Sequence, residues 1–245
     1  MFPQITEQSV YQLSTTKLHP LGTVFYADQG RKAYRYVQFG GTSTIASGLL
    51  VVAPAAPSNS TGLALDPSNT TANLSAGSKQ LFITNSTTAV VVDQFADGSV
   101  ELVGTNGNFS VRVAGNTAAG SGGVITLSLA EPLRNTSALV VGTNTANLRQ
   151  SLGYNPVASL TAAKAVGVTI MPVPNTSSVT NYGFVQIKGE ASVFATTATK
   201  DDQVVQDTSG TAGYLANDGA ATSEVVGVAQ EAAVSNFALV HLNIA

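Results

Sequence analysis

The sequence predicts an all-β protein made of antiparallel sandwich or barrel modules, with long loops and at most one short helix. Short segments alternate apolar and polar residues, and turn-forming residues separate them at the spacing typical of such folds, about eight to twelve residues. Only 10% of the 245 residues are charged, whereas 44% are hydrophobic, so Thr, Ser, Asn and Gln must supply the polar surface. The apolar content suffices for a core and excludes a disordered chain.

An arm and a hairpin are the first elements predicted. Residues 1–20 show mixed polarity without a sustained period, which indicates an arm. Residues 23–26 and 32–39 are predicted strands on either side of Asp28-Gln29-Gly30, whose residue types favour a tight turn. A hairpin therefore follows the arm.

The next predicted strand covers residues 45–52 and ends at a proline-rich stretch, because Pro has no backbone donor for a ladder. Residues 53–79 are rich in Pro, Ser, Asn, Thr and Gly, and they predict a long surface loop. Beyond it, the clearest hairpin signals are Asp97-Gly98 and Asn106-Gly107, each between apolar runs. The strands predicted in this region are 80–84, 89–95, 99–103, 109–113 and 124–129.

The one predicted helix lies in an alanine-rich region. Residues 145–152 and 157–166 have weak helical spacing, and Asn155-Pro156 marks a break between them. Residues 171–175 then form a stiff, proline-containing connector. The remainder, residues 182–244, is a series of short alternating strands.

A short internal similarity bears on the domain organisation. Tyr36-Val-Gln-Phe-Gly-Gly and Phe184-Val-Gln-Ile-Lys-Gly share an aromatic residue, Val-Gln, an apolar residue and a final Gly. Two unrelated strands ending in glycine turns are the favoured explanation, because the shared residue types are common. On the other interpretation the two ends of the chain fold together. The predicted organisation is then an arm at 1–20, a β module of 21–53 plus 176–245, and a β-rich elaboration at 54–175.

The residue types needed for catalysis are scarce. Cysteine is absent, which excludes disulfides, thiolate nucleophiles and cysteine-based metal sites. His19 and His241 are the only histidines, and no Gly-x-Ser-x-Gly turn supplies a nucleophile. We therefore predict a protein without catalytic residues and without a cofactor.

Acidic residues are predicted to cap turns, because most lie beside Gly, Ser or Thr. Calcium could use the oxygens of Asp201, Asp202 and Asp207, but the twelve-residue loop with a final Glu is missing. We predict no metal site, with a structural calcium left as an alternative. The candidates for paired carboxylates are Asp93, Asp97, Glu101, Asp201, Asp202, Asp207, Glu224 and Glu231.

Composition also limits the partners. The only dense basic cluster is Arg31, Lys32 and Arg35, and alternation in a strand divides these charges between two faces. We therefore expect a solvated strand or a subunit contact there, and no nucleic-acid binding. No apolar run is long enough to cross a membrane, and residues 1–20 lack the pattern of a secretory signal peptide. We expect no membrane association.

Three C-terminal segments carry a resemblance to a known family. They are Tyr182–Gly189, Asp202–Gly210 (DQVVQDTSG) and Val225–Ala232 (VVGVAQEA). The pattern resembles bacteriophage head decoration (capsid cement) proteins, as does the opening Leu21-Gly-Thr-Val with Tyr34-Arg-Tyr-Val-Gln. The resemblance covers less than half of the chain, and the middle segment matches no family known to us.

The resemblance implies a structural protein of the virion, made in the host cytoplasm and bound to the outer surface of the head. Its partners would be the major capsid protein and further copies of itself, often as a homotrimer. For these contacts we single out Tyr11, Leu13 and Leu21, because apolar side chains on a polar arm must be buried somewhere. Packing within the same chain is the equal alternative.

Two other function classes remain open from the sequence. One is a head-fibre or tail adhesin that uses the Thr- and Asn-rich middle segment to contact glycans on the host surface. The other is an enzyme acting on carbohydrates, which would need paired acids in a deep cleft. A flat, apolar underside would argue against the enzyme.

Overall fold

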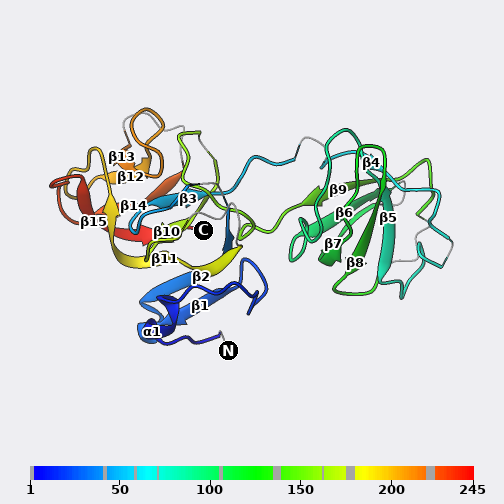
Figure 1. Ribbon diagram of the computed structural model, residues 1–245, viewed down its shortest axis with the longest axis horizontal. Coiled ribbons are helices and arrows are strands. Elements are labelled where there is room, and N and C mark those ends of the chain that lie inside the picture. The colour runs from blue at the N-terminus through cyan, green and yellow to red at the C-terminus, as the bar shows by residue number, and fades with distance from the viewer. Residues whose placement is uncertain are drawn as a thin grey trace. The chain divides into compact units, whose positions relative to one another are not determined.

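The computed structural model shows an all-β protein, as predicted (Figure 1). Within its described part it has fifteen strands, one four-residue α-helix and one 3-10 turn, and both sheets are antiparallel. The described residues are 3–40, 43–57, 60–70, 72–104, 107–134, 139–161, 163–174, 180–218 and 224–245.

The chain forms two compact units, and each is described by itself. The terminal unit contains residues 1–55 and 152–245, and the middle unit contains residues 56–151. The sequence assigned residues 54–175 to the elaboration, whereas in the structure residues 152–175 contribute a strand to the terminal unit. Both ends of the chain therefore belong to one sheet.

The sheet of the terminal unit is organised around one long strand, β11 (Asn181–Phe194). One edge of β11 pairs with β2 (Lys32–Phe39), and its other edge pairs first with β10 (Ala165–Thr169) and then with β15 (Phe237–Asn243). Ala195, just after β11, forms a parallel bridge with Leu215 of β13 (Leu215–Asn217), the last strand in the order of the sheet. The order is β1 (Val24–Ala27), β2 (Lys32–Phe39), β11, β15 (Phe237–Asn243), β14 (Val225–Ala229), β12 (Gln203–Gln206) and β13 (Leu215–Asn217), with β10 (Ala165–Thr169) and β3 (Leu50–Val52) as a branch.

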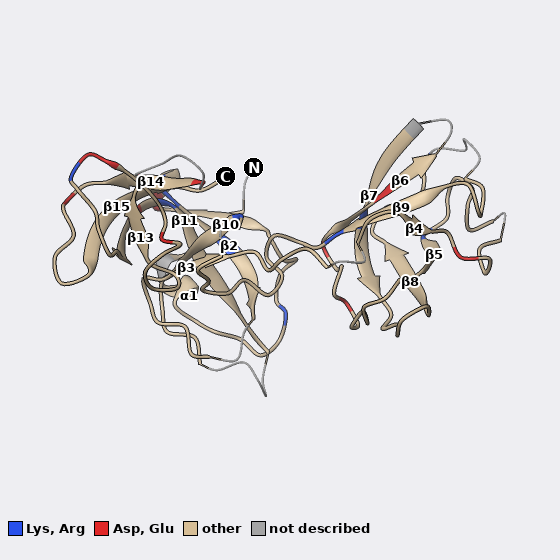
Figure 2. Cartoon of the chain, turned by 90° about the horizontal axis from the view of Figure 1, so that it is seen from above, with Lys and Arg blue, Asp and Glu red and all other residues tan. Residues whose placement is uncertain are grey.

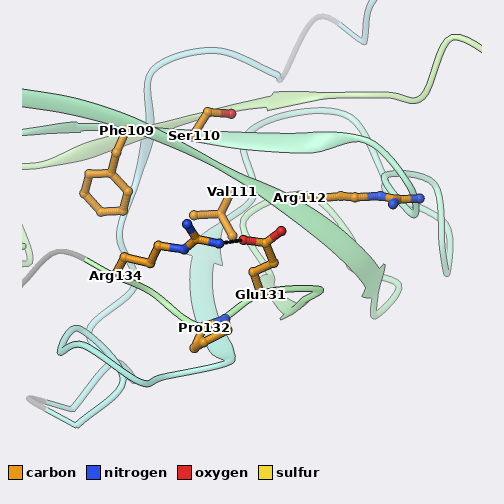
Figure 3. Close-up of a pocket in the computed structure, with 7 residues that line it drawn as sticks. All are labelled: Phe109, Ser110, Val111, Arg112, Glu131, Pro132 and Arg134. Atoms are coloured by element: carbon orange, nitrogen blue, oxygen red, sulfur yellow. Dashed lines mark hydrogen bonds and ion pairs between the residues drawn. The ribbon is translucent and has the colours of Figure 1, made fainter. Parts of the chain in front are cut away.

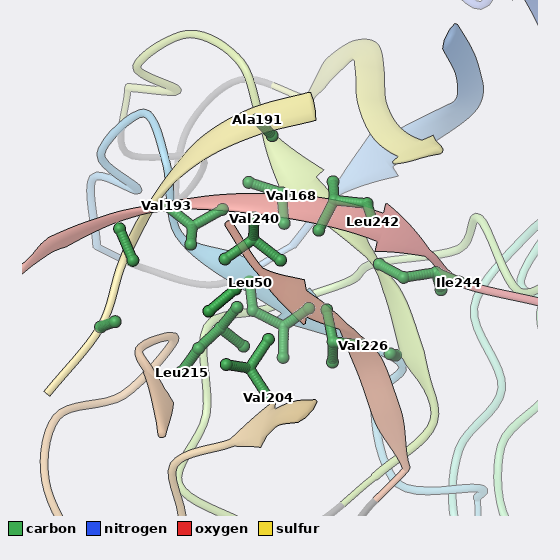
Figure 4. Close-up of a cluster of buried hydrophobic side chains, with 14 of the residues drawn as sticks. Leu50, Val168, Ala191, Val193, Val204, Leu215, Val226, Val240, Leu242 and Ile244 are labelled. Carbon is green, nitrogen blue, oxygen red and sulfur yellow. The ribbon is translucent and has the colours of Figure 1, made fainter. Parts of the chain in front are cut away.

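Alternation along these strands builds the core of the terminal unit (Figure 4). In the second half of β11 and in β15, every second side chain is buried and its neighbours are exposed or half-buried. Burying one such aliphatic side chain is worth about 2 kcal/mol, so the pattern fixes which face of each strand points inward. The labelled core residues are Leu50, Val168, Ala191, Val193, Val204, Leu215, Val226, Val240, Leu242 and Ile244.

The N-terminal arm packs on its own unit. Gln4 forms a bridge with Tyr26, and helix α1 (Glu7–Val10) follows. Ser14 then exchanges two backbone hydrogen bonds with Tyr182, at 2.9 and 2.8 Å. Val10 is fully buried in a cluster of aromatic side chains. The arm thereby covers β2, which is buried along nearly its whole length.

The predicted hairpin at the start of the unit is confirmed. β1 pairs with β2 through four residues, and the turn between them is the 3-10 segment Asp28–Gly30. All three turn residues have positive φ, at 48°, 54° and 86°; Gly30 adopts it without a steric penalty, and Asp is one of the residue types that tolerate it. The strand predicted over residues 45–52 is shorter, because β3 covers only Leu50–Val52.

The short helix predicted within residues 145–152 and 157–166 is wrong. Residues 145–149 form β9 (Thr145–Arg149) in the middle unit, and residues 165–169 form β10. Small side chains serve close strand packing here: Ala146 is fully buried, and a Cβ at Gly167 would lie 2.5 Å from a Val185 methyl carbon. Tertiary packing therefore overrides the helical preference of alanine, which the weak helical spacing of the segment does not reinforce.

The middle unit is a nearly closed barrel of six strands. A bridge between Leu65 and Ile83 brings the two ends of the sheet together. Its core consists of aliphatic side chains and Phe95, which is fully buried. The order is β4 (Leu63–Ala64), β9, β6 (Ser99–Gly104), β7 (Gly107–Asn116), β8 (Val124–Leu129) and β5 (Gln80–Thr84).

One of the two strongest hairpin predictions for this unit is confirmed and the other is wrong. β6 and β7 form a hairpin, although Asn106 of the predicted turn lies outside the described residues. Residues 89–95 do not form the strand expected before Asp97-Gly98, since only Val90 forms a bridge and turns follow. The buried Asn116 side chain bonds the amide of Phe95 and the carbonyl of Val91, and so replaces a strand partner.

Candidate functional site

The two histidines lie in different surroundings. His19 packs against the rings of Phe25 and Tyr36, with centroids 4.8 and 5.1 Å apart. His241 lies on the exposed face of β15, between Glu190 of β11 and Val228 of β14. In the described part of the chain, no group of three or more His, Asp or Glu side chains could hold a metal ion. No helix in that part is long and apolar enough to cross a membrane.

Asp207 shows that an acidic residue does cap a turn, as predicted. Its Oδ1 accepts hydrogen bonds from the amides of Ser209 (2.9 Å) and Gly210 (2.8 Å), and its Oδ2 accepts one from the Thr196 hydroxyl (2.9 Å). Burial alone would raise the pKa of Asp207, but these hydrogen bonds outweigh burial and lower that pKa below its ordinary value. The carboxylate is therefore committed to the turn.

Three other acidic residues from the sequence analysis also form ion pairs or hydrogen bonds with neighbouring groups. Asp97 pairs with Arg112 at 3.1 Å, and Glu101 accepts a hydrogen bond from Asn147. Glu224 pairs with Lys164 at 2.6 Å and accepts a hydrogen bond from the Ala165 amide. These contacts are structural, and no two of these carboxylates share a site.

The three residues of the basic cluster differ in exposure, because Arg31 is exposed, Lys32 is half-buried and Arg35 is buried. Arg35 is buried in β2, where its guanidinium donates to the carbonyl of Val166 at 2.8 Å. Burial lowers the pKa of Arg35, and the charge of Glu224 opposes that effect. Tyr34 and Tyr36 are each 1% exposed. The expectation of a solvated strand therefore fails for β2 itself, in which Arg35 and both tyrosines are buried.

The segments that carry the family resemblance lie in neighbouring strands of the terminal unit. Tyr182–Gly189 is in β11, Asp202–Gly210 contains β12 and the turn capped by Asp207, and Val225–Ala232 contains β14. In the sheet the order is β11, β15, β14 and β12. The pattern thus corresponds to one continuous part of a single sheet.

The three residues singled out for contacts differ in exposure. Tyr11 is 52% exposed. Leu13 is half-buried and packs against the core cluster that contains Phe39. Leu21 is only 5% exposed and belongs to the aromatic cluster beneath the arm. Within this chain, Leu13 and Leu21 therefore pack internally, and Tyr11 keeps most of its surface open.

A different apolar surface, which the sequence analysis missed, lies at the end of β11 and the start of β15. We call it the apolar edge: Phe194, Tyr214, Val234 and Phe237. Phe194 and Phe237 face each other across the two strands with ring centroids 4.2 Å apart, and Tyr214 stacks on Phe194 at 5.0 Å. Val234 is 71% exposed and Phe237 is 43% exposed.

The backbone holds the apolar edge in place. Val234 and Phe237 exchange two hydrogen bonds, at 2.8 and 3.0 Å, across a turn in which Ser235 and Asn236 have φ of 51° and 67°. Two positive φ angles are typical of the tight turns that join antiparallel strands. The Val-Ser-Asn-Phe sequence is the signal that could have revealed this exposed pair.

Comparisons with known proteins return no match: no family model, no curated protein and no solved structure matches this chain.

Proposed function

We propose that this protein is a viral structural protein that binds the outer surface of a phage head and stabilises the shell, as a decoration or cement protein. The observation that carries the proposal is the apolar edge. It is a set of packed aromatic and aliphatic side chains, of which Val234 and Phe237 are exposed, on the unit whose strands carry the family resemblance. Aromatic residues are enriched in protein interfaces, since they bury large areas at low entropic cost.

The surface chemistry supports assembly on a larger particle. Charged side chains are sparse along both units, as Figure 2 shows. Electrostatic repulsion between copies of the chain is therefore weak. A shell repeats the same binding site many times, so an oligomer with modest affinity per copy attaches firmly through several contacts. The proposed partners are the major capsid protein and copies of this chain, as a homotrimer.

The test is co-sedimentation of the purified protein with empty capsids of the virus that encodes it, followed by a heat-resistance assay of the shells. The proposal expects saturable binding and a higher shell melting temperature. Val234→Asp should reduce binding, because it places a charge in the contact. Val92→Asp is the matched control, because Val92 is similarly exposed, at 64%, but belongs to the middle unit. Capsids that bind no protein at all would refute the proposal.

The oligomeric state is tested separately. Size-exclusion chromatography with light scattering should give the mass of three chains of 24.9 kDa each. A single-chain mass at tens of micromolar, both alone and when eluted from shells, would contradict the trimer.

A further inference from the structure

The middle unit has a hollow of about 280 Å³ between β7 and the segment that follows β8 (Figure 3). Two observations show that its walls are fixed. The amide of Ala130 donates to the Arg112 carbonyl at 2.9 Å, which holds the following segment beside β7. Leu133 is 1% exposed, and its amide bonds the Ser78 carbonyl at 2.9 Å. The lining residues are Phe109, Ser110, Val111, Arg112, Glu131, Pro132 and Arg134.

The charges of this hollow are balanced. Arg134 pairs with Glu131, and Arg112 pairs with Asp97. The side chains of Arg134 and Glu131 are 81% and 58% exposed, so their ion pair contributes little stability and exchanges readily for a ligand. The negative charge of Glu131 would repel an anion, and the positive charge of Arg134 would repel a cation. The pair therefore suits a neutral ligand that both accepts and donates hydrogen bonds.

The hollow also has an apolar side. Phe109 is half-buried, and it packs against the core of the barrel. In Figure 3 its ring lies beside the Arg134 side chain, with Pro132 and Val111 nearby. A ligand must therefore present an apolar face to Phe109 and hydroxyl groups to Glu131 and Arg134. Sugar rings have this arrangement, because their C–H groups form an apolar face and their hydroxyls project from the rim.

We propose that this hollow binds one neutral hexose ring, as the terminal residue of a glycan. The Glu131 carboxylate accepts hydrogen bonds from two neighbouring hydroxyls, Arg134 donates to ligand oxygens, and the Phe109 ring stacks on the sugar. The volume lies just below the range of about 300 to 1,000 Å³ for drug-sized ligands, and a single ring is the matching size. This inference does not rest on capsid binding.

The test uses an array of immobilised glycans ending in neutral hexoses or N-acetylhexosamines, together with the same glycans capped by sialic acid. The wild-type protein should bind a subset of the neutral glycans and lose that binding when the sugar is capped. Glu131→Ala and Arg134→Ala should each weaken binding at least tenfold. Arg149→Ala is the matched control, because Arg149 is an exposed arginine of β9 that does not line the hollow. It should bind like the wild type.

Thermal unfolding of every variant checks that the barrel stays folded, which is expected because the changed side chains are exposed. Three results would overturn the inference: no glycan bound, binding only of sialylated glycans, or equal binding by the wild type and both pocket variants. The co-sedimentation assay with capsids uses no glycan. A negative result in that assay therefore bears on capsid binding alone, and a negative glycan array bears on this hollow alone.

Discussion

Replacing Asp207 by alanine tests the turn that joins β12 to β13. The carboxylate is 4% exposed and accepts hydrogen bonds from two backbone amides and from the Thr196 and Ser209 hydroxyls. The Asp207→Ala variant would leave all of these donors without that partner. The turn closes the path of strands around the core of the terminal unit, so its loss should lower the stability of that whole unit.

The expected loss of unfolding free energy depends on the number of hydrogen bonds to Asp207 and on how exposed their donors are. A hydrogen bond to a charged group contributes about 1.5 to 3 kcal/mol when the donor is buried. Thr196, Ser209 and Gly210 are exposed, so water replaces part of what the carboxylate provides. We expect the free energy of unfolding of the terminal unit to fall by about 2 to 3 kcal/mol.

Tyrosine fluorescence is the appropriate probe in urea. The chain has no tryptophan, and all seven tyrosines lie within residues 1–55 and 152–245. The fluorescence transition therefore reports the terminal unit alone, while circular dichroism reports both units. Asp207→Ala should shift the fluorescence midpoint and leave the part of the dichroism transition due to the middle unit unchanged.

The pH dependence provides a second readout. The folded pKa of Asp207 is lowered relative to its unfolded value of about 3.9. Its stabilising contribution is therefore fully present above about pH 4 and is lost as pH falls through the folded pKa. The difference between the wild type and the Asp207→Ala variant should be constant near neutral pH and shrink in acid. A difference below about 0.5 kcal/mol at pH 7, or one unchanged by acid, would refute the reasoning.

Three further substitutions test other parts of the fold. A Cβ at Gly98 would lie 2.0 Å from the Arg149 carbonyl oxygen, so Gly98→Ala should destabilise the middle unit by about 3 kcal/mol or more in dichroism-monitored melts; an unchanged melting temperature would contradict this. Asn116→Ala should cost about 2 to 4 kcal/mol in the same unit, because buried backbone groups lose their partner, and a cost under about 1 kcal/mol would count against it. Tyr36→Phe removes the hydroxyl that accepts a hydrogen bond from the Leu18 amide at 2.9 Å, and hydrogen exchange of that amide should accelerate about tenfold, equivalent to about 1.4 kcal/mol; equal exchange would exclude the contact.

Local signals in the sequence account for most of the strands. Asp28-Gln29-Gly30 predicts its hairpin because the residue types needed for positive φ stand together. The failed strand at 89–95 depends on Asn116, which lies about twenty positions further on and whose side chain supplies the hydrogen bonds. The failed helix depends on close packing of Ala146 and Gly167 against other strands. Neither cause can be seen in a local window.

The candidate surfaces were harder to predict than the fold. The apolar edge joins Phe194, Tyr214 and Phe237, which come from three separate segments and meet only through the pairing of β11 with β15 and the bridge to Leu215. The hollow of the middle unit likewise combines β7 with residues beyond β8. Of the three contact residues chosen from the sequence, Leu21 is apolar because it belongs to the core.

The points at which the chain leaves and re-enters the terminal unit have a consequence for how the chain can be shortened. Val52 and Val157 exchange two backbone hydrogen bonds, at 2.9 and 3.0 Å, so the chain leaves and re-enters the terminal unit at neighbouring points. A short peptide could bridge these points without disturbing the sheet. Replacing the barrel by such a peptide should therefore leave the sheet of the terminal unit, with its apolar edge, folded on its own.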